Sequence, residues 1–207
     1  MEKFYLEIPS INRKNEIIEY INELVANNSE THGIGSLDLI LEGYTFEEAL
    51  ERCLNLENEE FAKKINKNQS KTFLLIRVTD NKIVGIINVR WNLRNEMLQF
   101  GGHIGYGIRP TERGKGYNKI NLYLGLKVCK EYGIDQVFMD ADLDNPASWK
   151  TMEALGGERT RQYYDGENAH CEVVDYNIDV KKSLEKYRNF EECIFDDKKV
   201  KENREVK

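Results

Sequence analysis

Residues 108–118 contain the side chains and spacing with the clearest chemical meaning in this sequence. They place Gly114 and Gly116 among the cations Arg113 and Lys115, between an expected strand and a long expected helix. A glycine turn at the start of a helix directs several unpaired backbone N–H groups to one point, where the helix dipole favours negative charge. The pattern indicates a phosphate site, with a glycine turn that binds no ligand as an equal alternative.

Two common phosphate-binding motifs do not explain this segment. A P-loop would place Ser or Thr directly after the lysine, whereas Lys115 is followed by Gly116. The dinucleotide-binding fingerprint follows the first strand of its domain, and this segment follows a later one. The glycines therefore need another explanation.

The elements that must position this segment follow from the spacing of apolar residues. Strands are expected near residues 1–9, 72–78, 83–91, 101–110, 136–141, 159–164 and 169–180, and helices near 12–26, 45–54, 114–132 and 148–155. Thr45 and Glu48 fit a capping box, and Asp80-Asn81-Lys82 fits a hairpin turn. The order β-α-α-β-β-β-α-β-α-β-β predicts an α/β (α+β) fold on a mixed sheet.

The strand expected at 101–110 has an unusual face. His103, Gly105 and Gly107 alternate with apolar residues, so that the two glycines leave one face without side chains. Another group can then approach the backbone closely.

Composition limits the possible classes of protein. The chain has 207 residues, 40% of them hydrophobic and 32% charged, which suits one domain that folds without metal or disulfide. Thirty Lys and Arg stand against 36 Asp and Glu, and the net charge of −6 argues against nucleic-acid binding. No segment approaches the ~18 consecutive apolar residues of a membrane span. The four cysteines lack ligand spacing, so we expect a cytoplasmic protein in a reducing compartment.

Several motifs together resemble one family. The run Arg-Pro-Thr-Glu-Arg-Gly-Lys-Gly-Tyr at 109–117 follows His-Ile-Gly-Tyr-Gly-Ile at 103–108 and precedes Asp-Asn-Pro-Ala-Ser at 144–148 and Leu-Gly-Gly at 155–157. This combination resembles the GNAT N-acetyltransferase superfamily and, within it, a bacterial subgroup of predicted acetyltransferases. The match is specific to the superfamily and not to a substrate.

The resemblance covers most of the chain. It implies the GNAT acyl-CoA N-acyltransferase fold for residues 1–180. Residues 181–207, which are rich in charge, are expected to form a helical appendage or tail. Dimerisation through this appendage is left open.

The resemblance also implies acetyl-CoA as cosubstrate, without a metal. Arg113 begins the family's Arg/Gln-x-x-Gly-x-Gly/Ala motif, whose backbone amides cradle the pyrophosphate, and Asn118 departs from the small residue that ends it. For Asn145, a helix cap is an equal alternative to ligand contact. The residues carried over to cofactor binding are Ile108, Arg113, Gly114, Lys115, Gly116, Tyr117, Asn118, Asn145 and Ser148.

Acetylation of an amine requires a nitrogen without its extra proton. A lysine-like ammonium has a pKa near 10.4, so a nearby base is expected. His103 is the first candidate, with a structural histidine as an equal alternative. Glu96, in an expected turn, is the second. His32 and His170 have no supporting motif.

The departing CoA thiolate benefits from a proton donor. Many members of the family use a tyrosine about seven residues after the asparagine, and Met152 stands at that position here. Tyr163, Tyr164, another phenol or water could meet this need. Tyr106, beside the glycines, is a further candidate catalytic phenol, with an aromatic residue of the core as the commoner alternative.

The function that these residues predict is direct transfer of an acetyl group from acetyl-CoA to a primary amine of a small molecule or peptide. A CoA-binding sensor or interaction module without turnover is the alternative from another class, and transfer of a longer acyl group is a second alternative. The sequence does not identify the acceptor.

Overall fold

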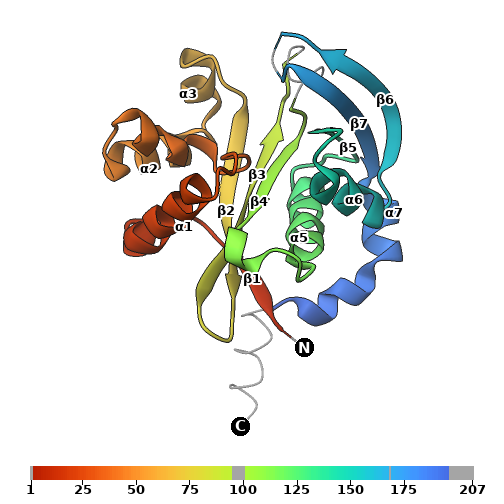
Figure 1. Cartoon of the computed structure of the whole chain (residues 1–207), viewed down its shortest axis with the longest axis horizontal. Helices are drawn as coiled ribbons and strands as arrows, with labels where there is room; N and C mark the ends of the chain where they lie inside the picture. Colours follow the sequence, from red (N-terminus) through yellow and green to blue (C-terminus); the bar gives the residue numbers. More distant parts are fainter. Residues whose placement is uncertain (1, 95–100, 168, 196–207) are drawn as a thin grey trace.

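The computed structural model describes residues 2–94, 101–167 and 169–195, which form two antiparallel sheets and the helices around them (Figure 1). One sheet has the strand order β1-β2-β3-β4 and the other β5-β7-β6. The strands are β1 (Phe4–Glu7), β2 (Gln69–Arg77), β3 (Lys82–Trp91), β4 (Ile104–Ile108), β5 (Gln136–Asp142), β6 (Glu158–Asp165) and β7 (Cys171–Asp179).

The helices and 3-10 turns lie between these strands. They are η1 (Ile11–Arg13), α1 (Lys14–Ala26), η2 (Gly35–Glu42), α2 (Phe46–Asn55), α3 (Glu59–Lys64), η3 (Pro110–Glu112), α5 (Tyr117–Glu131), α6 (Pro146–Ala154), α7 (Val180–Lys186) and η4 (Arg188–Cys193). The order contains every element that the sequence predicts, and the fold class is confirmed. The short helix α3 and the 3-10 turns are additions to it.

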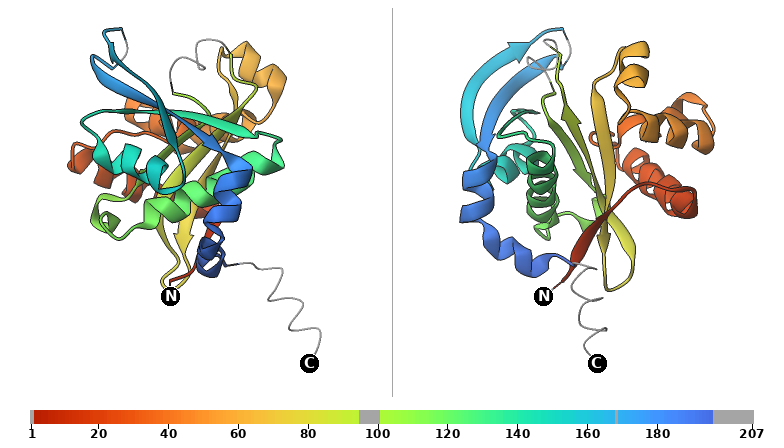
Figure 2. Two further views of the ribbon diagram at one scale, coloured as in Figure 1. Left: turned by 90° about the vertical axis from the view of Figure 1, so that its right-hand side faces the viewer. Right: turned by 180° about the vertical axis from the view of Figure 1, so that it is seen from behind.

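Helices cover both faces of the first sheet. The helices α1 and α2 lie on one side, and α5 lies on the other side, between this sheet and β5-β7-β6 (Figures 1 and 2). Helix α5 is buried on nearly all sides, because Leu122, Leu126 and Cys129 pack in one core cluster with β3, β4, β5 and β7. A second cluster joins α1, η2 and α2 to β2 and β3. None of the helices in the described ranges is long and apolar enough to cross a membrane.

Two local predictions are confirmed. The capping box at α2 forms in both directions, with the Glu48 N–H donating to Thr45 Oγ1 at 3.3 Å and the Thr45 N–H donating to Glu48 Oε2 at 2.8 Å. The β2–β3 hairpin turns at Asn81, whose φ of 57° suits asparagine better than most residues.

The segment after β7 packs back onto the domain. Leu184 and Tyr187 contact the main core cluster, and the Phe195 N–H donates to the Phe4 carbonyl at 2.8 Å. The rest of the expected tail, residues 196–207, lies outside the described residues. The expected boundary at residue 180 stays a prediction.

Candidate active site

The strands β4 and β5 are edge strands of the two sheets, and they touch at the start of β4. The His103 N–H donates to the Phe138 carbonyl at 2.8 Å, and the Phe138 N–H donates to His103 Nδ1 at 3.0 Å. Gly102 fits closely here, since a Cβ on it would lie 2.2 Å from the Phe138 carbonyl oxygen. We call this contact the junction; beyond it, β4 and β5 belong to separate sheets.

His103, the first candidate base, is part of the junction. Its Nδ1 accepts the Phe138 N–H, so the neutral ring carries its proton on Nε2 and has no free lone pair there. Burial, together with the positive charge of Arg90, holds the pKa of His103 below its usual range. Of the two interpretations that the sequence left open, this geometry favours the structural one.

Tyr106, the candidate catalytic phenol, crosses from β4 to the start of α6. Its hydroxyl lies 3.0 Å from the Ser148 carbonyl oxygen and 3.2 Å from Ser148 Oγ. Burial raises the pKa of Tyr106, so the phenol keeps its proton at neutral pH and has it available to donate. Met152 packs in the same core cluster as Tyr106 and is 1% exposed.

The other two tyrosines considered as proton donors lie on β6. Tyr163 is half-buried, with the guanidinium of Arg161 at 4.0 Å from its ring centroid. Tyr164 is 62% exposed. Of the three tyrosines, Tyr106 is thus the one that is buried in the core and fixed against the first turn of α6.

The glycine turn before α5 has an open backbone. Gly114 has a φ of 76° and Gly116 a φ of 79°, and apart from the adjoining residues of the chain no described heavy atom lies within 4 Å of a Cβ built on either one. Gly116 is the N-cap residue of α5, and within the described part of the chain no side chain caps that helix start. The glycines are thus required by backbone conformation, and the N–H groups of the first turn are left open to a ligand.

The cations of this turn are held by nearby oxygens. Arg113 Nε donates to the Ile108 carbonyl at 3.2 Å, and Arg113 Nη2 donates to Ser29 Oγ at 3.0 Å. Lys115 Nζ donates to Glu112 Oε2 at 2.8 Å. A phosphate that bound at the turn would therefore meet cations whose geometry is already constrained.

Glu112 is an unexpected centre of charge beneath the turn. It is 4% exposed and pairs with Arg77 at 2.6 Å and Lys82 at 3.0 Å as well as with Lys115. Burial alone would raise its pKa, but the hydrogen bonds from Arg77, Lys115 and Lys82 outweigh it and lower the pKa to about 2.

The remaining expected cofactor residues lie around the same helix ends. Asn118 Nδ2 donates to Thr151 Oγ1 of α6 at 3.4 Å, and its buried Oδ1 has no hydrogen-bond partner within the described ranges. Asn145 caps α6 by accepting the Ser148 N–H at 3.2 Å, which is the alternative that the sequence kept open. The ring of Tyr117 packs on Phe4 with a centroid distance of 4.8 Å.

The glycine face of β4 is occupied by the protein itself. A Cβ on Gly105 would lie 2.5 Å from Arg90 Nη2, and a Cβ on Gly107 would lie 3.1 Å from the His32 carbonyl oxygen. Gly33 approaches most closely, since a Cβ on it would lie 2.5 Å from the Tyr106 Cα. The close approach is confirmed, and its partner is the segment that leads to η2.

Sequence reasoning missed the anchor of the turn to α1. Arg109 is 2% exposed, and its Nη1 contacts Glu19 at 2.8 Å and Glu23 at 3.2 Å. Glu23 also accepts the Thr111 N–H and hydroxyl, both at 2.8 Å. No local pattern could have paired residues almost 90 positions apart.

Sequence reasoning also missed two carboxylates in the second sheet. Asp140 on β5 and Asp175 on β7 are directly opposite each other in the strand pairing. Each one stands between two hydrophobic neighbours in its strand, and that was the available signal.

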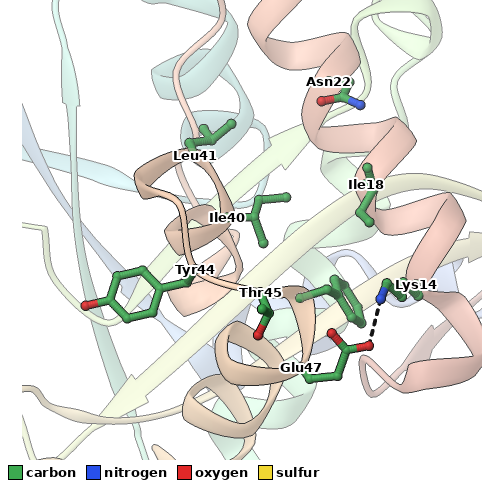
Figure 3. A pocket seen from close by; sticks show the side chains of 9 residues that line it. Lys14, Ile18, Asn22, Ile40, Leu41, Tyr44, Thr45 and Glu47 are labelled. Carbon is green, nitrogen blue, oxygen red and sulfur yellow. Dashed lines mark hydrogen bonds and ion pairs between the residues drawn. The ribbon is translucent and has the colours of Figure 1, made fainter.

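The other expected residues do not gather here. His32 is exposed and pairs with Glu30, and His170 is exposed. Glu96 lies outside the described residues. A hollow of about 440 Å³ between α1 and η2, lined by Ile18, Leu41 and others, shares no residue with the junction or the turn (Figure 3).

Residues 40–158, over half of the chain, match the family model described as an acetyltransferase (GNAT) domain. The fold and the match define a protein of the acetyltransferase class. The chain belongs to the GNAT acetyltransferase family, and its general activity is acetyl transfer. No curated protein matches the sequence significantly.

Solved structures agree with this fold. The ribosomal-protein-S5-alanine acetyltransferase from Vibrio fischeri has a TM-score of 0.63 and 17% identity, over 86% of this chain and 94% of that one. A spermidine N-acetyltransferase chimera from Vibrio cholerae and hSSAT has a TM-score of 0.59 and 16% identity, over 88% and 98%. A ribosomal L7/L12 alpha-N-protein acetyltransferase in complex with coenzyme A has a TM-score of 0.60 and 16% identity, over 86% and 96%.

Proposed function

We propose that this protein is an acetyl-CoA-dependent N-acetyltransferase that acts by direct transfer to a primary amine of a small molecule or peptide. The observation that carries the proposal is the open glycine turn at the start of α5. This turn follows the end of the edge strand β4, and the start of the same strand forms the junction. The bound coenzyme A of one structural neighbour, and the alanine and spermidine in the names of two others, support it.

The chain's own residues fit acetyl-CoA. The backbone N–H groups of Gly114 to Asn118 would receive the pyrophosphate, because the space above Gly114 and Gly116 is free of side chains. The pantetheine arm would follow the edge of β4 from Ile108 toward His103, which brings the thioester close to the junction.

Tyr106 would protonate the leaving thiolate in this arrangement. Its phenol keeps its proton at neutral pH, and the neighbouring Ser148 hydroxyl can donate to the phenolate that forms. In many members of the family the proton donor is a tyrosine at the position that Met152 has here. In this chain Tyr106 on β4 would take that role.

His103 would then keep β4 and β5 together at the thioester, with its Nε2 proton as a donor. A second function, CoA binding without turnover, is favoured by one observation: Met152 replaces the usual tyrosine in a fully packed position. A cytoplasmic location and a homodimer stay predictions.

The proposal is tested by measuring CoA binding by calorimetry and thiol release from acetyl-CoA with spermidine, an alanine-terminated peptide and ethanolamine. We expect CoA binding and thiol release that depends on at least one amine. CoA binding without release for any amine would support the binding module instead.

A further inference from the structure

The two carboxylates of the second sheet form a pair on the face opposite α5 and α6. Asp140 and Asp175 are Cα partners in the antiparallel β5–β7 pairing, which places their side chains on the same face about 5 Å apart at Cβ. Their neighbours Met139 and Val174 belong to the helix-side core. Since side chains alternate along a strand, the two aspartates lie on the other face.

The contacts of Asp140 place this pair at the junction. Its Oδ2 accepts the Gly101 N–H at 2.6 Å, and the carbonyls of Gly101 and Gly102 accept hydrogen bonds from Arg90 at 2.7 and 2.8 Å. His103 follows directly in the chain. Asp140 is thus fixed beside the point where β4 and β5 separate.

Asp175 has a carboxylate oxygen without a hydrogen-bond partner among the described residues. Its Oδ2 accepts from Arg161 Nε at 2.6 Å, but its Oδ1 is buried and no described donor reaches it, and the whole residue is 3% exposed. A buried acceptor without a partner costs about 1–3 kcal/mol, and more when it is charged. Such a group suggests a donor that arrives from outside the chain.

We propose that Asp140 and Asp175 form the acceptor site, in which they bind the substrate ammonium and take up one of its protons. This inference rests on the proposed function. It assigns a cationic amine as the acceptor class, because an ammonium supplies both the donors and the positive charge that the pair needs.

The position of the pair matches the path of the acetyl group. Tyr106 reaches the junction region from the helix side, whereas Asp140 and Asp175 lie on the opposite face. The amine would therefore approach the thioester from the face that carries Asp140 and Asp175. Tyr106, the proton donor for the leaving sulfur, would act from the helix side. This separation keeps the attacking and leaving groups from competing for one proton site.

The proton balance of the reaction closes with these groups. The pair takes one proton from the ammonium and later gives it to water, and the neutral amine forms a C–N bond to the acetyl carbon. The C–S bond breaks as Tyr106 gives its proton to the sulfur. A second proton then leaves the nitrogen and returns to Tyr106 through water, so that amide, free thiol and one released proton are the products.

Electrostatics support a base at this position. Burial raises the pKa of Asp140, and the negative charge of Asp175 adds to the effect. Burial also raises the pKa of Asp175, against the pairing with Arg161. The charged and titratable groups that interact with the pair are Arg161 and Tyr163 on β6, Asp142 on β5 and Arg90 on β3. Asp165 acts on Tyr163, and His103 feels the charge of Arg90. Two close carboxylates with raised pKa values share a proton readily.

The test compares Asp175→Asn and Asp140→Asn with Glu172→Gln, an exposed acid on the same strand as Asp175 that serves as the matched control. For whichever of spermidine, the alanine-terminated peptide and ethanolamine wild type acetylates, we expect each Asp variant to lower kcat/KM about 100-fold. We also expect the acid limb of its pH profile to disappear. Affinity for CoA should stay within twofold, which shows that the variant is folded.

Three results would overturn the inference. Wild-type kcat/KM in both Asp variants, with an active wild type, would contradict the acceptor site alone. A loss that is equal at every pH would indicate a structural role. Wild type that binds CoA but acetylates none of these amines would contradict the proposed function, and the acceptor site with it.

Discussion

The cofactor turn and the carboxylate pair bind by different physical means. The turn uses backbone N–H groups of consecutive residues, and Gly114 and Gly116 keep side chains away from them. The pair uses the half-buried side chain of Asp140 on β5 and the buried one of Asp175 on β7, which the chain brings together across 35 positions. One region is open and local, and the other is enclosed and assembled by the fold.

Because of this difference, the two regions should tolerate different substitutions. A backbone site depends on conformation at single residues, so a side chain added at a glycine should abolish it. A side-chain site depends on charge and burial, so an isosteric change that removes a charge should be enough. The predictions below test this contrast.

Gly116→Val should have the largest effect. Valine at a φ of 79° is strained by about 1–3 kcal/mol and places a branched side chain where the phosphates would lie. We expect affinity for CoA, measured by calorimetry, to fall about 100-fold or more. The control is Gly133→Val at the other end of α5, which has a φ of 72° and open space around its Cβ. Equal loss of affinity in both variants would contradict the phosphate role.

Tyr106→Phe should lower turnover about 10- to 100-fold without changing the affinity for CoA, because only the proton of the phenol is lost. The measurement is thiol release at saturating amine. Tyr132→Phe, which removes a hydroxyl bonded to Glu57 at 2.7 Å, is the control. If Tyr106→Phe retained full turnover, another group or water would be the proton donor.

His103→Ala should lower the free energy of unfolding by about 1–3 kcal/mol, because the Phe138 N–H at the junction loses its acceptor. Turnover should fall severalfold by a factor that does not depend on pH. His103→Asn, whose side-chain oxygen can accept from the same N–H, should recover most of the free energy of unfolding and most of the turnover. A loss that is large near pH 7 and small at high pH would instead identify His103 as the base.

Glu112 gives the smallest expected effect. Its folded pKa of about 2 lies below the unfolded value, so its ionised form stabilises the fold at neutral pH. That stabilisation is lost as the pH falls from about 5 toward 2. Urea unfolding should show wild type losing about 1–2 kcal/mol more than Glu112→Gln over this window. Parallel pH dependence in the two proteins would contradict the ion-pair cluster beneath the turn.

The sequence predicted the regions whose chemistry is local. The strands, the capping box at Thr45 and the glycine turn depend on residues within a few positions of each other, and the structure has all of them. The family was also within reach, because each of its motifs, at 103–117, 144–148 and 155–157, is a short continuous run, and the family match over residues 40–158 covers them. Local physics was sufficient for these features.

The acceptor side could not be predicted in the same way. The pairing of Asp140 with Asp175 depends on the register of β5 and β7, and the contact of Arg109 with Glu19 depends on how α1 packs. The hydrogen bond from the Phe138 N–H to His103 also joins two distant segments. Strand register and helix packing are set by the whole core, so a single sequence gives no direct sign of them.

The most direct test of the proposed activity follows a labelled acetyl group from acetyl-CoA to nitrogen. Wild-type protein is incubated with ¹³C-acetyl-CoA and ¹⁵N-labelled spermidine or alanine-terminated peptide, and the products are analysed by NMR. We predict a one-bond ¹³C–¹⁵N coupling that appears with wild type and that builds up about 100-fold more slowly with Asp175→Asn. Persistence of the label on CoA with both amines, in a protein that binds CoA, would contradict the account.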